Sequence, residues 1–200
     1  MSVDLINRRS IILASASPRR HQLVSGLGIN FSVMVREVDE VWPGDLRHSE
    51  IPEYLAVLKA DAFVTEELPE DYILITADTV VFLNGRVLGK PENREHAIAI
   101  LNSLQGERHE VITAVCLTTS LNRILFHVSS DVWFRPIEEP EIIWYVDHYQ
   151  PYDKAGAYGV QEWIGYAGIE KINGSFFNVM GLPTQRLYLE LLSLIRKEEQ

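Results

Sequence analysis

Residues 11–20 read Ile11-Ile12-Leu13-Ala14-Ser15-Ala16-Ser17-Pro18-Arg19-Arg20, and the rest of the chain is organised around them. The apolar run from Ile11 to Ala14 predicts a short buried strand. Ser17 is a good N-cap residue, and Pro18 suits the first turn of a helix because its missing N–H is not needed there. The stretch therefore predicts a strand, a turn and a helix in succession.

Two arginines, Arg19 and Arg20, fall in the first turn of this expected helix. Positive side chains at a helix N-terminus oppose the helix dipole, so helix stability alone would not select them. A bound phosphate would offset the repulsion, because it accepts hydrogen bonds from free N–H groups, hydroxyls and guanidinium groups together. The alternative is two solvated arginines at the start of a surface helix.

The composition is that of an ordinary globular protein with an acidic balance. The 200 residues are 46% hydrophobic and 23% charged, with a formal net charge of −10. This charge argues against a general nucleic-acid or membrane-surface binder. The single cysteine, Cys116, lies in an apolar run and is expected in the core. Charged residues precede an apolar run too short for a signal peptide or a membrane span, so we expect a cytoplasmic protein.

Further elements alternate along the chain between expected strands and helices. Strands are expected at Ile29–Val35, Tyr72–Ala77 (ending at Asp78), Glu110–Thr119 and Ile124–Phe134. Helices are expected from Ser17 to Gly26 or Gly28, from Pro52, and over Glu92–Leu104, Pro140–His148 and Thr184–Lys197, with loops and short strands over 151–183. This mixture predicts an α/β fold with a mixed sheet flanked by helices.

The dipeptide Asn84-Gly85 between apolar flanks predicts a two-residue hairpin turn. Counting back from the turn pairs Leu83 with Arg86 and Val81 with Leu88. The same register places Asp78 and Thr79 near Lys90 at the base of the hairpin.

The side chains available for chemistry favour phosphate and metal binding. Arg19, Arg20, Lys59 and Lys90 supply positive charge, and Asp39, Glu40 and Asp78 supply the hard oxygen ligands that Mg²⁺ prefers. Each has a plain alternative: Asp78 as a turn-forming residue, Asp39 and Glu40 as a solvated edge, and the lysines as surface residues. The six histidines have no metal-ligand spacing. No P-loop, nucleophile-elbow or zincin motif occurs.

Several stretches together resemble the Maf family of nucleoside triphosphate pyrophosphatases, in its branch that cleaves dTTP and UTP. The matching stretches are 13–20 (LASASPRR), 55–60 (LAVLKA), 76–79 (TADT), 88–91 (LGKP), 153–161 (DKAGAYGVQ) and 173–183 (NGSFFNVMGLP). The resemblance implies an elongated, twisted mixed sheet flanked by helices, with an ITPase-like architecture. It also implies a single domain over residues 1–200 whose two lobes form one central cleft, often in a homodimer.

The resemblance further implies hydrolysis of a nucleoside triphosphate to the monophosphate and pyrophosphate, with a divalent metal ion. Mg²⁺ is expected, with Mn²⁺ or Co²⁺ as alternatives. Asp78 is implied as the proton acceptor, and Arg19, Thr79 and Gln161 as the residues that select the substrate. The remaining phosphate and metal ligands implied by the family are Ser15, Arg20, Asp39, Glu40, Lys59 and Lys90. The family more often has Glu at the position of Asp39.

Gln161 suits a pyrimidine base with an imide, because its amide matches the N3–H and O4 of both uracil and thymine. We therefore expect dTTP and UTP as substrates, together with modified pyrimidine nucleotides, in house-cleaning of the nucleotide pool. One alternative is a pyrophosphatase for a purine or other modified nucleotide. Another is a non-catalytic nucleotide-binding regulator of cell division. Neither nucleic acid nor membrane is expected as a partner.

Overall fold

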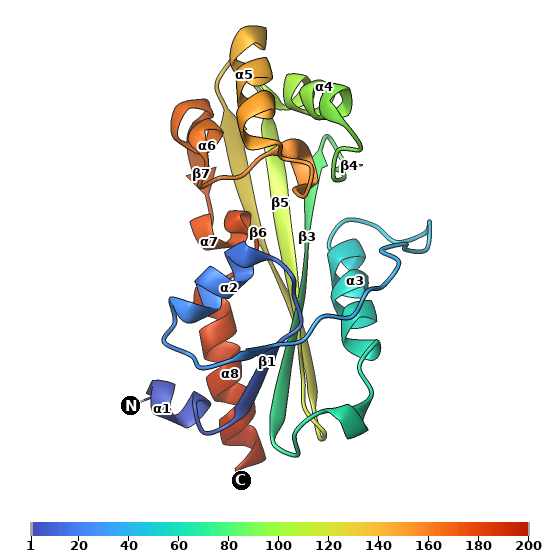
Figure 1. Cartoon of the computed structure of the whole chain (residues 1–200), viewed down its shortest axis with the longest axis vertical. Helices are drawn as coiled ribbons and strands as arrows, with labels where there is room; N and C mark the ends of the chain where they lie inside the picture. Colours follow the sequence, from blue (N-terminus) through green and yellow to red (C-terminus); the bar gives the residue numbers. More distant parts are fainter. Residues whose placement is uncertain (1, 200) are drawn as a thin grey trace. The chain divides into compact units, whose positions relative to one another are not determined.

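The computed structural model describes residues 2–199 as a mixed α/β fold (Figure 1). The strands are β1 (Ser10–Leu13), β2 (Ser32–Val33), β3 (Tyr72–Leu83), β4 (Arg86–Leu88), β5 (Arg108–Thr118), β6 (Arg123–Phe134) and β7 (Ile169–Asn173). The α-helices are α1 (Ser2–Ile6), α2 (Pro18–Ser25), α3 (Glu50–Asp61), α4 (Arg94–Leu104), α5 (Glu139–Tyr149), α6 (Trp163–Gly168), α7 (Phe176–Met180) and α8 (Thr184–Glu198). Two 3-10 turns are η1 (Thr65–Glu67) and η2 (Ala155–Ala157).

The strands of residues 2–199 are hydrogen-bonded in the order β2-β1-β3-β5-β6-β7, with β4 beside β3. Strand β1 is parallel to both β2 and β3, whereas β4 is antiparallel to β3 and β7 is antiparallel to β6. The predicted α/β class with a mixed sheet flanked by helices is confirmed.

The chain forms two compact units. The first contains the residues up to Asp78, residues 113–128 and the residues from Gly181 onward. The second contains residues 79–112 and 129–180. Strands β3, β5 and β6 contribute residues to both units. The prediction of a single domain with one central cleft stays a prediction.

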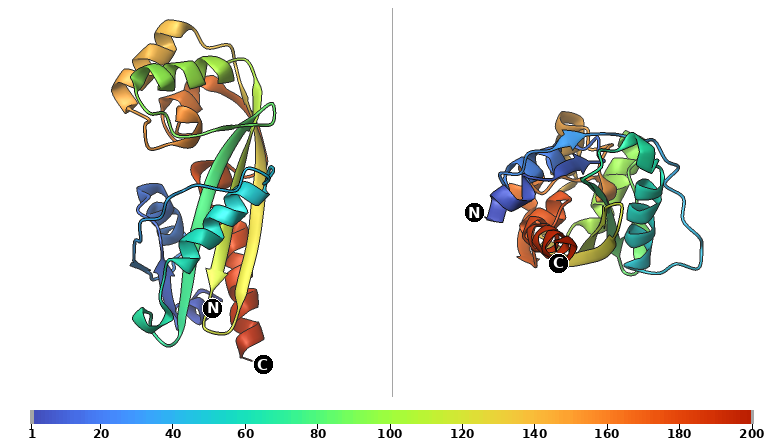
Figure 2. Two further views of the ribbon diagram at one scale, coloured as in Figure 1. Left: turned by 90° about the vertical axis from the view of Figure 1, so that its right-hand side faces the viewer. Right: turned by 90° about the horizontal axis from the view of Figure 1, so that it is seen from below.

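In the first unit, helices cover both faces of the strands (Figures 1 and 2). Helix α3 packs Ala56 and Ala60 against a buried cluster that contains Ile12, Leu74 and Cys116. Helix α8 lies on the opposite side of the strands and buries its apolar stripe, Leu187, Leu191 and Leu194. Removal of this apolar surface from water is the main stabilising term for the unit.

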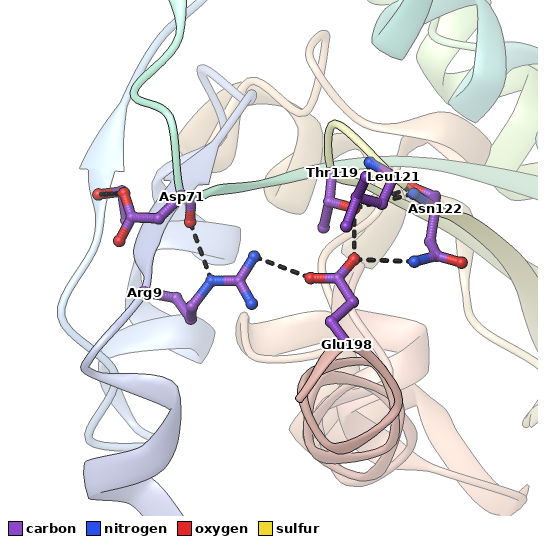
Figure 3. A network of polar contacts seen from close by, with 7 residues as sticks. Arg9, Asp71, Thr119, Leu121, Asn122 and Glu198 are labelled. Carbon is purple, nitrogen blue, oxygen red and sulfur yellow. Dashed lines mark hydrogen bonds and ion pairs between the residues drawn. The ribbon is translucent and has the colours of Figure 1, made fainter. Parts of the chain in front are cut away.

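A polar network fastens the end of α8 to the same unit (Figure 3). The Glu198 carboxylate accepts hydrogen bonds from the Thr119 hydroxyl at 2.6 Å, the Asn122 amide at 3.0 Å and the Arg9 guanidinium at 2.9 Å. Arg9 Nε also donates to the backbone carbonyl of Asp71 at 3.0 Å. The C-terminal helix is therefore linked to the segment before β1 and to the turn between β5 and β6.

In the second unit, the β3–β4 hairpin has the predicted register. Leu83 pairs with Arg86 and Val81 with Leu88, which confirms the turn at Asn84-Gly85. Both turn residues have positive φ, 50° and 77°, as a type I′ turn requires. Helix α4 packs against α5 and η2 in this unit.

Two local predictions were wrong. Strand β3 does not end at Asp78 but runs on to Leu83, 12 residues in all from Tyr72, because the Asp78 carboxylate has a partner, Lys59, outside the strand. The expected strand over Ile29–Val35 is reduced to Ser32–Val33, whose two side chains are exposed. The predicted N-cap position of Ser17 is confirmed, although its side chain makes no capping hydrogen bond.

Helix α1 carries no sequence signal that predicts it. Of the helices described, none has both the length and the apolar character needed to cross a membrane.

Candidate active site

A buried carboxylate and a lysine form the centre of the candidate site in the first unit. Asp78 is 7% exposed, and its Oδ1 lies 2.6 Å from Nζ of Lys59. Lys59 is in the last turn of α3, where a cation also stabilises the helix dipole. The Thr76 hydroxyl, two residues before Asp78, donates to the carbonyl of Ala56 at 2.7 Å, which fixes α3 against β3.

Arg20 holds the backbone beside Asp78. Its Nη1 donates to the carbonyl of Ala77 at 2.9 Å, and its Nε donates to the carbonyl of Gly181 at 2.9 Å. The planar guanidinium can span two fixed acceptors in this way, whereas an ammonium is a single point charge. Arg20 therefore joins α2, β3 and the segment that leads into α8, in addition to any contact with substrate.

Burial and neighbouring positive charges shift the pKa of Asp78 in opposite directions, and burial is the larger influence. Burial raises the pKa of the Asp78 carboxyl above its ordinary value, although the positive charges of Lys59 and Arg20 act in the opposite direction. Burial likewise lowers the pKa of Arg20, and the charge of Asp78 opposes that shift. A carboxylate with a raised pKa is a better proton acceptor than an exposed one, since the proton it takes is held more firmly.

The turn between β1 and α2 is built around Ser15. Its side chain is buried, its Oγ accepts a hydrogen bond from the N–H of Ser17 at 3.2 Å, and its carbonyl lies 2.6 Å from Nε2 of His21. His21 lies in the first turn of α2, so its contact with the Ser15 carbonyl holds the preceding turn against the helix. Arg19 lies in the first turn of α2 and is half-buried.

Glu40 shares the ammonium group of Lys59 with Asp78. Glu40 Oε1 lies 2.8 Å from Nζ, so two carboxylate oxygens from distant parts of the sequence face one cation. This pair of donors has the chemistry that a hard divalent cation requires. Asp39 lies beside Glu40 in an exposed loop. Within residues 2–199, no three acidic, histidine or cysteine side chains are arranged as a metal site, so the metal stays a prediction.

The other predicted site residues, Thr79, Lys90 and Gln161, lie in the second unit. Thr79 is half-buried in β3, and Lys90 is exposed just after β4. The carbonyl of Gly89 accepts a hydrogen bond from the N–H of Gly156 at 3.1 Å, which joins the loop of Lys90 to the segment that carries Gln161. The Gln161 Oε1 atom is buried and accepts no hydrogen bond within the described part of the chain.

The family described as "Maf-like protein" matches residues 10–194 of this chain. The chain is a member of the Maf-like protein family. The match spans the segments that carry Ser15, Lys59, Asp78 and Gln161, and it confirms the resemblance found in the sequence.

Curated relatives in the Maf-like family align over almost the whole chain. A protein of Bacteroides thetaiotaomicron is 55% identical over 190 residues, covering 94% of this chain and 98% of the relative. A protein of Flavobacterium johnsoniae is 43% identical over 195 residues, covering 98% and 100%. Both relatives are named dTTP/UTP pyrophosphatase. Among solved structures, the Ham1 protein of Staphylococcus aureus aligns with a TM-score of 0.45 at 18% identity, covering 96% of this chain and 100% of that one.

Sequence reasoning missed several residues that contact the predicted site residues within each unit. His21 follows Arg20 directly, but an isolated histidine gives no signal. In the second unit, Tyr145 and Glu162 contact the segment that carries Gln161, although they are 17 positions apart and belong to no common motif. The position of Glu162 next to Gln161 was the one available indication.

Proposed function

We propose that the chain is a nucleoside triphosphate pyrophosphatase that hydrolyses dTTP and UTP to the nucleoside monophosphate and pyrophosphate. The observation that carries the proposal is the buried Asp78 carboxylate, 2.6 Å from the Lys59 ammonium. It is the residue that the resemblance to the family implies as the proton acceptor, in a chain whose relatives bear the name dTTP/UTP pyrophosphatase. The role is house-cleaning of the nucleotide pool, and we assign the protein to the cytoplasm, where that pool is found.

In this reaction a water molecule attacks the α-phosphorus and pyrophosphate leaves. Asp78 accepts the proton of the water, and its raised pKa suits that task. Lys59 holds the Asp78 carboxylate in one orientation and keeps positive charge beside the reacting phosphate. When bound, a divalent metal ion would neutralise part of the triphosphate charge, and Asp39, Glu40 and Asp78 would hold it.

The β- and γ-phosphates are assigned to the basic residues and to the turn before α2. Arg19 and Lys90 supply positive charge, and Ser15 supplies a hydroxyl. Arg20, whose guanidinium interacts electrostatically with Asp78, adds further positive charge. Backbone N–H groups at the start of α2 would donate hydrogen bonds to a bound phosphate, as helix N-termini do.

Gln161 is assigned to the base, with Thr79 and Arg19 as further selectivity residues. Its Oε1 is a buried acceptor that no described donor satisfies, and such an atom is costly unless a partner arrives. The N3–H of uracil or thymine is a donor of the right kind, whereas cytosine has no hydrogen at N3. This complementarity favours UTP and dTTP over CTP.

A nucleotide panel tests the proposal. The protein is incubated with Mg²⁺ and each of UTP, dTTP, CTP, ATP and GTP, and the released pyrophosphate is measured. Release from UTP and dTTP well above CTP supports the proposal. Release from purine nucleotides alone would replace it with a purine-directed pyrophosphatase, and binding without release would replace it with a nucleotide-binding regulator.

A further inference from the structure

A buried hydroxyl in the second unit contacts the backbone beside Gln161. Tyr145 lies on α5 with its side chain fully buried. Its hydroxyl oxygen accepts a hydrogen bond from the N–H of Gly159 at 3.1 Å, and its O–H donates to the carboxylate of Glu162. One tyrosine oxygen thus joins the residue two positions before Gln161 to the residue directly after it.

The other oxygen of the Glu162 carboxylate is also held. Glu162 Oε1 lies 3.2 Å from Nζ of Lys154, and the same ammonium lies 2.7 Å from Oδ1 of Asp153. The Lys154 and Glu162 side chains are 10% and 16% exposed. Charged side chains as buried as Lys154 and Glu162 are retained only where partners compensate their charges. Asp153, Lys154, Glu162 and Tyr145 together form one polar network.

The backbone between the two held positions is a tight turn. The N–H of Glu162 donates to the carbonyl of Gly159 at 3.0 Å. A Cβ atom at Gly159 would lie 2.6 Å from Cδ of Glu162, so the carboxylate occupies the space that the absent side chain leaves. Residues 159–162 are therefore held both by the backbone hydrogen bond of the turn and by the contacts of the Glu162 side chain.

Gln161 lies inside this turn, and its buried Oε1 has no donor within residues 2–199. An acceptor that must meet one N–H of a base depends on its position to within a few tenths of an ångström, because hydrogen bonds weaken steeply with poor geometry. A freely moving loop would also let water satisfy the amide oxygen, and the preference for a base that offers a donor would fall.

We propose that Tyr145 and Glu162 are positioning residues that hold residues 159–162 so that Gln161 discriminates uracil and thymine from cytosine. The inference rests on the proposed function, because it assigns a cause to the base selectivity that the function requires. It gives Tyr145 no contact with substrate. Burial raises the pKa of the Tyr145 hydroxyl, so it stays a neutral donor to Glu162 under all ordinary conditions.

The experiment compares kcat/KM for UTP and for CTP in the whole protein and in Tyr145→Phe. Loss of the hydroxyl leaves the Gly159 N–H and one Glu162 oxygen without their partner, so the UTP:CTP ratio should fall about fivefold or more. Glu162→Ala should lower the ratio in the same direction, and it serves as the second variant if Tyr145→Phe does not fold. An unchanged ratio accompanied only by a lower melting temperature would overturn the inference.

Tyr149→Phe is the matched control. Tyr149 lies one turn further along α5, its ring stacks on that of Tyr145 at 5.0 Å, and it is 38% exposed. The same loss of a hydroxyl from the same helix should leave the UTP:CTP ratio unchanged. A fall equal to that of Tyr145→Phe would show a general effect of α5 and contradict the inference.

A double mutant separates this inference from the proposed function. If Gln161→Ala lowers the UTP:CTP ratio and adding Tyr145→Phe lowers it no further, Tyr145 acts through Gln161 as proposed. If the two effects are independent, the positioning role is wrong although the function stands. If the wild-type protein releases no pyrophosphate from UTP, or Gln161→Ala has no effect, the proposed function or its base assignment fails first.

Discussion

Asp78 owes its character to two opposing influences on one carboxylate. Burial raises its pKa, while Lys59 and Arg20 favour its ionised form. Neither influence alone gives a useful base: an unpaired buried carboxyl would remain protonated, and an exposed ion pair would be a weak proton acceptor. The Lys59 ammonium also pairs with Glu40, so one positive charge is shared by two carboxylates.

Asp78→Asn should leave the fold intact and lower turnover of UTP by about a hundredfold or more, as expected for a lost general base. The amide still accepts a hydrogen bond from Lys59, so the packing is retained. Steady-state pyrophosphate release, with circular dichroism as a check on folding, gives the measurement. Asp147→Asn is the control: it changes an exposed aspartate that pairs with Arg94 at 2.6 Å, and it should keep wild-type turnover. Near-normal turnover in Asp78→Asn would contradict the role of the base.

His109 predicts a pH dependence of stability. Its side chain is 1% exposed, its Nε2 lies 2.7 Å from the Tyr158 hydroxyl, and burial lowers its pKa from 6.5 to about 4. The unfolded chain takes up the proton first as the pH falls, so this contribution to the free energy of unfolding is complete above pH 6.5 and declines between pH 6.5 and pH 4. The decline amounts to about 3 kcal/mol.

Urea unfolding of wild type and His109→Gln from pH 7 to pH 4 measures this contribution. The variant should lose less stability than wild type over that interval. His148→Gln, at an exposed histidine, is the matched substitution for comparison. Identical slopes for wild type and His109→Gln would show that His109 does not account for the dependence.

At the scale of elements, side chains from one helix or strand hold the backbone of another. Arg20 of α2 donates to backbone carbonyls at Ala77 and Gly181. The carboxylate of Glu198 on α8 accepts hydrogen bonds from Arg9, Thr119 and Asn122. Such bonds add little individually, yet leaving one buried partner unsatisfied costs its full desolvation.

Arg20→Lys should destabilise the protein by about 1–2 kcal/mol, although it conserves the charge, because one ammonium cannot bond to both carbonyls. Turnover should fall with it, since the bond to Ala77 fixes the backbone beside Asp78. Thermal unfolding and pyrophosphate release give the two readouts. A variant with wild-type stability and a raised KM alone would mean that Arg20 serves only the substrate.

Glu198→Ala should lower the free energy of unfolding by about 2 kcal/mol, because three donors lose a common acceptor whose side chain is 5% exposed. Although burial alone would raise the pKa of Glu198, its hydrogen bonds from Thr119, Asn122 and Arg9 lower it. Glu190→Ala removes an ion pair with Arg186 within the same helix and should cost only about 0.5 kcal/mol. Urea unfolding measures both variants. Equal losses in the free energy of unfolding would show that the three hydrogen bonds to Glu198 contribute no more than one surface ion pair.

At the scale of the whole molecule, the sequence predicted what depends on local pattern. The Asn84-Gly85 turn fixed the register of the β3–β4 hairpin, and the apolar periodicity of residues 184–197 located α8. The resemblance supplied the family and the candidate residues. The continuation of β3 through Asp78 was missed, because the partner that makes a carboxylate tolerable there lies 19 positions earlier, on another element.

Contacts without a sequence signal were missed for the same physical reason. The pairing of Tyr145 with Glu162 and the two carbonyls bound by Arg20 depend on tertiary packing, which no spacing within a motif encodes. The exposed segment around Val33 shows the converse, since apolar residues predicted a longer strand than the structure contains. Long-range partners decide where a polar side chain can be buried, and so they decide the site.

The most direct test of the central claim is to identify the products of UTP by ³¹P NMR, with Mg²⁺ present and with Asp78→Asn as the blank. Cleavage between the α- and β-phosphates predicts UMP and pyrophosphate in equal amounts, formed by wild type and almost absent with Asp78→Asn. Formation of UDP and inorganic phosphate would contradict the account. So would a yield of UMP and pyrophosphate from Asp78→Asn as high as that from wild type.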